Sequence, residues 1–177
     1  MSEKDTLGEV KAKQGLLSKI EDILFFGKGT REDLKEFDKQ LREDYHNMLR
    51  GQRRDWENTY LQVLEAGQPL LNRRFKAVLL SYDRVMAEIN RASYGYAPMF
   101  NRRGGIGQTE LARAFGYDKQ FGGQLTQLGE AANKATEAVE AGAWKAASTI
   151  VAEVKARLED VEKQWKEREK AFRPAGE

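Results

Sequence analysis

The side chains that most often carry catalysis or bind transition metals are almost missing from this 177-residue chain, which has one histidine, His46, and no cysteine. Asp44 lies only two residues before His46, so on a helix the two side chains point to different faces. Glu43 and His46 have the Glu-x-x-His spacing of a di-metal carboxylate site, but such a site takes a second pair from a facing helix, and no second histidine exists. We therefore predict no enzyme activity, no catalytic residue, no metal and no cofactor.

A glycine-rich run, Arg103-Gly-Gly-Ile-Gly107, resembles a phosphate-binding loop in composition alone. A phosphate loop follows an apolar strand and leads into Lys-Ser/Thr, and neither feature is present here. The acidic residues instead mostly alternate with Lys and Arg, and some form i, i+4 pairs with them, as Glu153 does with Arg157. The run is interpreted as a hinge, the pairs as solvated helix surface, and no small-molecule substrate is evident.

Residues 108–125, QTELARAFGYDKQFGGQL, resemble a helix-turn-helix motif. The resemblance covers about 18 residues and rests on small and apolar residues around Gly116. The pair Gly122-Gly123 departs from the pattern, since two glycines weaken a helix meant for the major groove. The alternative is a purely structural helical corner that leads the chain into its last helix. Under the DNA-binding alternative the contacts would come from Arg102, Arg103, Gln108, Thr109, Lys119 and Gln120.

The segment before this motif is the clearest predicted loop, over 95–108, with four glycines and one proline between 94 and 108. It combines flexible backbone with aromatic and arginine side chains, which are enriched at protein interfaces. We predict that it contacts a partner through Tyr94, Tyr96, Phe100, Arg102 and Arg103.

Apolar residues recur every eleven positions toward the C-terminus, a period close to that of a straight α-helix. This spacing predicts one helix over 124–172, roughly 70 Å long at 1.5 Å per residue. A compact chain of this length has a radius of gyration near ~16 Å, so the molecule is expected to be elongated. The row comprises Leu128, Val139, Ile150, Val161 and Phe172, and a second row comprises Ala132, Ala143, Val154 and Trp165. Partner contacts are predicted at Leu128, Val139, Ile150, Val161 and Trp165.

Helical spacing of apolar residues and glycine or proline breaks divide the remaining chain. Gly67-Gln68-Pro69 is short enough to join two antiparallel helices. The fold class expected is all-α: an elongated helical bundle or antiparallel coiled coil in a single domain over 1–177. The expected helices cover approximately 7–26, 31–66, 70–94, 109–116 and 124–172.

Composition supports this class, with 33% charged and 40% hydrophobic residues and only three prolines. Residues 69–103 carry seven basic and two acidic side chains, a net charge of +5, which leaves −3 for the rest of a chain whose total is +2. The absence of cysteine favours a reducing cytoplasm. The charged N-terminus shows no secretory core, and no apolar run is long enough to span a bilayer.

These observations predict a non-catalytic cytoplasmic scaffold, adaptor or assembly protein that binds protein partners or itself through helix–helix contacts. One alternative is the DNA-binding protein described above. A second alternative is a peripheral protein that meets a lipid surface through amphipathic helices over 15–26 and 124–172.

Overall fold

The computed structural model describes residues 31–91 and 108–172, of which 95% are helical. Residues 1–30, 92–107 and 173–177 lie outside the described part, and with them the predicted helix over 7–26 and nearly all of the predicted loop over 95–108. The predicted all-α class is confirmed. The helices in the described ranges are α2 (Arg31–Glu65), α3 (Pro69–Arg91), α5 (Gln108–Glu140) and α6 (Trp144–Phe172).

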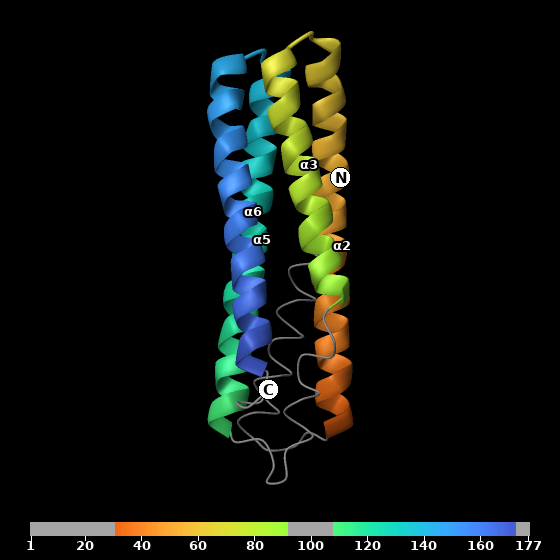
Figure 1. The fold of residues 1–177 in the computed structure, drawn as a ribbon, viewed down its shortest axis with the longest axis vertical. Coiled ribbons are helices and arrows are strands. Elements are labelled where there is room, and N and C mark those ends of the chain that lie inside the picture. The colour runs from red at the N-terminus through yellow and green to blue at the C-terminus, as the bar shows by residue number, and fades with distance from the viewer. Residues whose placement is uncertain (1–30, 92–107, 173–177) are drawn as a thin grey trace.

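These helices form two antiparallel hairpins, α2–α3 and α5–α6, whose turns lie at the same end of an elongated bundle (Figure 1). Helix α2 packs against α3 and α5, and α6 packs against α5 and α3. The four therefore occupy the corners of a square in the order α2, α3, α6, α5. Helix α3 is shorter than the others and ends part-way along the bundle, so α2, α5 and α6 continue without it toward the far end (Figure 1).

Alternating steps of three and four residues place one stripe of each helix in the core. In α3 the stripe is Leu71, Phe75, Val78, Tyr82, Val85 and Ile89, all buried. In α6 it is Ala147, Val151, Val154, Leu158, Val161, Trp165 and Arg168. A mean step of 3.5 residues keeps such a stripe facing its neighbours along the whole helix. Packing of these stripes is the main stabilising term, because isolated helices gain little from propensity alone.

The two hairpin turns use the same hydrogen-bonded motif. Gly67 has φ +66° and Gly142 has φ +65°, a left-handed conformation in which glycine carries no side-chain penalty. In the second turn the Gly142 N–H donates to the Val139 carbonyl and the Ala143 N–H donates to the Ala138 carbonyl, and the first turn repeats this pattern. This is the Schellman motif, which ends a helix by satisfying its last carbonyls.

The predicted single helix over 124–172 is therefore wrong, because the chain reverses at residues 141–143. The eleven-residue rows arise from the alternating spacing, since steps of four, three and four also total eleven. The Leu128–Val139 step lies within α5 and the Val154–Trp165 step within α6, and all four residues are buried. The second row is interrupted at the turn between α5 and α6, because Ala143 is exposed there. An eleven-residue step therefore does not distinguish one long helix from two shorter ones.

The predicted short helix over 109–116 and the turn of the helix-turn-helix motif are also wrong, because α5 runs without interruption through Gly116, Gly122 and Gly123. Gly122 and Gly129 lie where α5 approaches α2, whereas a Cβ at Gly116 or Gly123 would meet nothing within 4 Å. A Cβ at Gly122 would lie 3.7 Å from the Tyr45 ring, and one at Gly129 would lie 2.9 Å from the Gln52 amide nitrogen. Burial of Phe121, Leu125 and Leu128 on the same helix offsets the backbone cost of about 1 kcal/mol per glycine.

None of the helices over 31–91 and 108–172 is both long and apolar enough to cross a bilayer.

Candidate functional site

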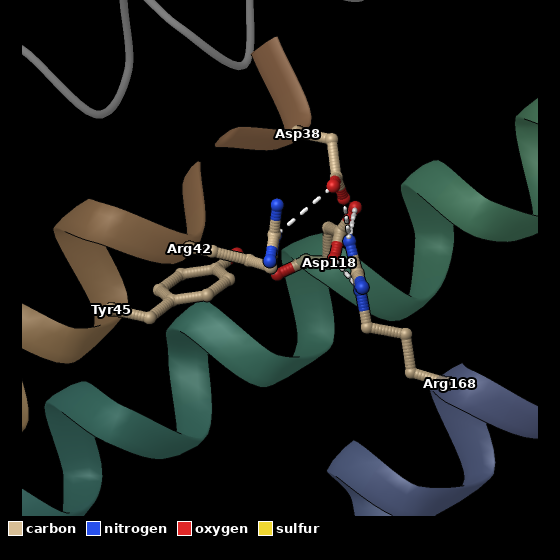
Figure 2. A network of polar contacts seen from close by, with 5 residues as sticks. All are labelled: Asp38, Arg42, Tyr45, Asp118 and Arg168. Atoms are coloured by element: carbon tan, nitrogen blue, oxygen red, sulfur yellow. Dashed lines mark hydrogen bonds and ion pairs between the residues drawn. The ribbon is translucent and has the colours of Figure 1, made fainter. Parts of the chain in front are cut away.

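A buried network of charges joins three helices at the end of the bundle away from the hairpin turns (Figure 2). Arg168 of α6 is only 1% exposed. Its Nη2 donates to Oδ1 of Asp38 on α2 at 2.7 Å, and its Nε donates to Oδ1 of Asp118 on α5. One guanidinium therefore bridges two carboxylates that belong to different helices.

A second arginine joins this network. Arg42 of α2 donates from Nε to Oδ2 of Asp38 at 3.0 Å, so two arginines face two aspartates. The side chains of Asp38 and Asp118 have no exposed surface, whereas Arg42 keeps 14% of its own. Burying an ion costs several kcal/mol, and this cost is met only when each charge is paired and hydrogen-bonded.

An aromatic ring packs against the guanidinium, and two further rings pack beyond it. The Cζ atom of Arg168 lies 4.8 Å from the centroid of the Trp165 ring, a cation–π contact. Trp165 packs against Phe121 with ring centroids 5.2 Å apart, and Phe121 meets Tyr45 edge-on at 4.9 Å. The attraction between the charges is stronger in this low-dielectric surrounding than it is in water.

Tyr45 adds a neutral hydrogen bond to the network. Its hydroxyl donates to the backbone carbonyl of Asp118 at 2.7 Å. Burial, and then the negative charge of Asp118, raise the pKa of Tyr45 well above its usual value. The phenol therefore keeps its proton and acts as a donor that ties α2 to α5.

A repeated motif in the sequence marks this network, which was not among the predicted sites. Phe37-Asp38-Lys39-Gln40-Leu41 and Tyr117-Asp118-Lys119-Gln120-Phe121 share the order aromatic, Asp, Lys, Gln, apolar. Because α2 and α5 run parallel and side by side, the two motifs bring their aspartates to the same level. Arg168 carries its own signal, since it stands where the spacing of Leu158, Val161 and Trp165 calls for an apolar residue.

The geometry suits a structural role for this network. Three helices are held at one relative height, because a slip of one turn would separate Arg168 from both carboxylates by about 5 Å. Within the described residues, no group of three or more histidine, cysteine or acidic side chains is arranged to hold a metal ion. His46 contacts Asn90 of α3 at 3.1 Å, from Nε2 to Nδ2, on the surface of the bundle.

The residues predicted to bind a partner lie mainly inside the protein or outside the described part. Leu128, Val139, Val161 and Trp165 are buried in the core of the bundle, and Ile150 is half-buried against it. Their stripe packs within one chain, because the turn at Gly142 folds α6 back onto α5. The predicted loop contacts Tyr94, Tyr96, Phe100, Arg102 and Arg103 lie outside the described residues.

The residues named for the DNA-binding alternative do not form a separate recognition helix. Gln108 and Thr109 begin α5, and Lys119 and Gln120 are exposed further along the same uninterrupted helix. A recognition helix needs a turn before it so that a second helix can cross the DNA backbone. Helix α5 has no such turn.

A second feature, which the sequence analysis also missed, is an outer face of the α2–α3 hairpin that carries leucines. The large hydrophobic side chains exposed among the described residues are Leu61 (50%), Leu64 (43%), Leu70 (77%) and Leu80 (62%). All four belong to the first hairpin, α2–α3. Exposed large apolar side chains that gather on one element are candidates for an interaction site.

Three of these leucines share one side of the hairpin, which an ion pair identifies. Arg53 of α2 donates to Asp83 of α3 on the outer surface, and this contact raises the pKa of Arg53. Residues three, four, seven, eight or eleven positions apart share a helix face. On α2, Glu57, Leu61 and Leu64 follow Arg53 by four, eight and eleven residues; on α3, Leu80 and Lys76 precede Asp83 by three and seven. We refer to these five residues, Glu57, Leu61, Leu64, Leu80 and Lys76, as the leucine face.

The second hairpin shows that the bundle does not require these leucines. Its buried positions follow those of the first hairpin at an interval of 76 residues, as in Phe75 and Val151 or Tyr82 and Leu158. At the same interval, Leu61 and Leu64 correspond to Glu137 and Glu140, and Leu80 corresponds to Ala156. The corresponding surface of α5–α6 is thus polar or small where that of α2–α3 is apolar. The leucine face is the candidate functional site.

No protein-family model matches the chain, and no curated protein or solved structure is significantly similar to it.

Proposed function

We propose that this protein is a non-catalytic scaffold or assembly protein of the cytoplasm, which binds a protein partner by helix–helix contacts on its leucine face. The observation that carries the proposal is the exposure of Leu61, Leu64 and Leu80 on one side of one hairpin. Burying a fully exposed leucine contributes about 1.5–3 kcal/mol, so each of these half-exposed side chains would contribute about half of that in a contact.

Contacts inside the first hairpin support the same proposal, because they fix the position of α2 relative to α3. Trp56 stacks on Phe75 with ring centroids 4.4 Å apart and donates from Nε1 to the Phe75 carbonyl at 3.1 Å. These contacts lock α2 to α3 beneath the leucine face. The alternating three- and four-residue spacing is typical of coiled coils, and we propose that the bundle is an antiparallel coiled coil of this kind.

Site-specific crosslinking tests the function directly. Because the sequence contains no cysteine, an introduced cysteine is the only thiol that can be labelled. Glu57→Cys places a single thiol on the leucine face, and Asn133→Cys places one at the matching exposed position of the second hairpin. After labelling with a photoreactive maleimide, the Glu57→Cys protein should crosslink to a protein in native extract, or to itself. The Asn133→Cys protein should not. Equal crosslinking at both sites, or at neither, would refute the proposal.

A further inference from the structure

We infer that the leucine face is the interface of a twofold dimer of this chain, in which α2 of one copy packs against α3 of the other. The inference rests on the proposed scaffold function and names its partner. It follows from the distribution of charge over the two arms of the α2–α3 hairpin, and from the size of the surface they form.

The two arms carry opposite charges beside the turn. Residues 55–65 of α2 include Asp55, Glu57 and Glu65 and no basic residue. Residues 69–80 of α3 include Arg73, Arg74 and Lys76 and no acidic residue. All six are exposed. Within one chain, Arg74 reaches Ser148 of α6 and Glu57 pairs with Arg53 at 2.9 Å, whereas Arg73 and Lys76 are exposed.

Opposite charges on two arms make a surface complementary to a second copy of itself. A twofold axis along the bundle brings α2 of each copy beside α3 of the other, with the turns at one end. Glu57 stands ten residues before Gly67 and Lys76 stands nine after it, so the two meet at nearly the same height. The symmetry repeats this pair, and charge complementarity of this kind sets both orientation and partner. The leucines of both copies then lie between the charged rows and are removed from water.

The available area is sufficient for a specific contact. Helix α3 has 23 residues, which gives a length of about 34 Å at 1.5 Å per residue, and two adjacent helices are about 20 Å wide. The hairpin therefore offers roughly 700 Å² per copy, close to the ~800 Å² per partner of a standard interface. The second hairpin has the same dimensions but presents Glu137 and Glu140 where the first presents Leu61 and Leu64.

The first test is the mass of the full-length protein, measured by light scattering over a dilution series. We expect twice the chain mass of 20.2 kDa. Leu61→Glu with Leu64→Glu should weaken self-association at least about a hundredfold. The control, Ala146→Glu with Ala156→Glu on the second hairpin, adds the same charge and should remain dimeric. A wild-type monomer at all concentrations, or dissociation of the control alone, would overturn the inference.

The second test exchanges charges and identifies which helices meet. Glu57→Arg with Glu65→Arg makes both arms basic, and Arg73→Glu with Lys76→Glu makes both arms acidic. Each variant alone should be monomeric, since its contacts now repel. Mixing the two should restore a dimer that contains one copy of each, which also shows that both variants are folded. Dimers of either variant alone, or monomers after mixing, would overturn the α2-to-α3 pairing.

The failure of this inference can be distinguished from failure of the proposed function. If the wild type is a monomer and Glu57→Cys still crosslinks to another protein, the dimer is wrong and the scaffold function stands. If the monomer instead floats with vesicles containing anionic phospholipid, and Leu61→Glu with Leu64→Glu abolishes flotation, the face binds lipid and both proposals fail.

Discussion

Replacing Arg168 by methionine should destabilise the bundle more than any exposed ion pair can. At an effective dielectric constant near 20, two charges about 2.7 Å apart attract by about 6 kcal/mol, and burial costs several kcal/mol per ion. The intact network is thus close to neutral in net free energy. Arg168→Met removes the attraction but leaves Asp38 and Asp118 buried. The expected loss is about 3–5 kcal/mol in the free energy of unfolding, or about 6–20 °C in Tm.

Urea unfolding followed by far-ultraviolet circular dichroism measures this loss, and two further variants serve as comparisons. Arg157→Met removes a surface arginine that bonds Glu153 at 2.8 Å, and it should cost no more than about 1 kcal/mol. The combination of Arg168→Met with Asp38→Asn and Asp118→Asn removes the three fully buried charges and leaves Arg42, which keeps 14% of its surface exposed, so it should recover part of the stability. The reasoning is refuted if Arg168→Met costs no more than Arg157→Met, or if the triple variant is no more stable than Arg168→Met alone.

Three further predictions test the backbone and the core. Gly142→Ala should lower the free energy of unfolding by about 1 kcal/mol, because φ there is +65°. Chemical denaturation measures this change, and an increase in the free energy of unfolding would instead favour the continuous helix over 124–172. Gly123→Ala should stabilise α5 by up to about 1 kcal/mol, since a Cβ there meets nothing within 4 Å. Gly129→Ala should stabilise the protein less than this, or destabilise it, because its Cβ displaces the Gln52 amide that donates to the Leu125 carbonyl. Burial raises the pKa of Tyr82, so its stability contribution is complete below the unfolded pKa of about 10 and is lost as pH rises through the folded value. Its hydroxyl has no hydrogen-bond partner among the described residues, so Tyr82→Phe should keep or raise stability at neutral pH and reduce the alkaline loss, as unfolding curves at a series of pH values will show.

The sequence by itself determined the helical class and the first hairpin. The three- and four-residue steps from Leu71 to Ile89 place one apolar stripe on one face, and only a helix does that. Gly67 next to Pro69 marks a turn because glycine accepts a positive φ and proline starts a helix without an unpaired N–H. Both signals are local, so no distant residue is needed to interpret them.

Only the tertiary structure decided how the second half of the chain folds and which surfaces remain free. Ala141-Gly142-Ala143 contains no proline, and its surroundings have the same periodicity as an uninterrupted helix, so packing of α6 against α5 selects the turn. The pairing of Arg168 with Asp38 joins residues 130 positions apart, and no local pattern specifies such a contact. The glycines of α5 resemble helix breaks in sequence, yet the helix continues through them, and Gly129 leaves room for Gln52 of α2. The leucine face likewise emerges only once the core has taken up the other apolar residues, because exposure depends on the whole bundle and not on residue type.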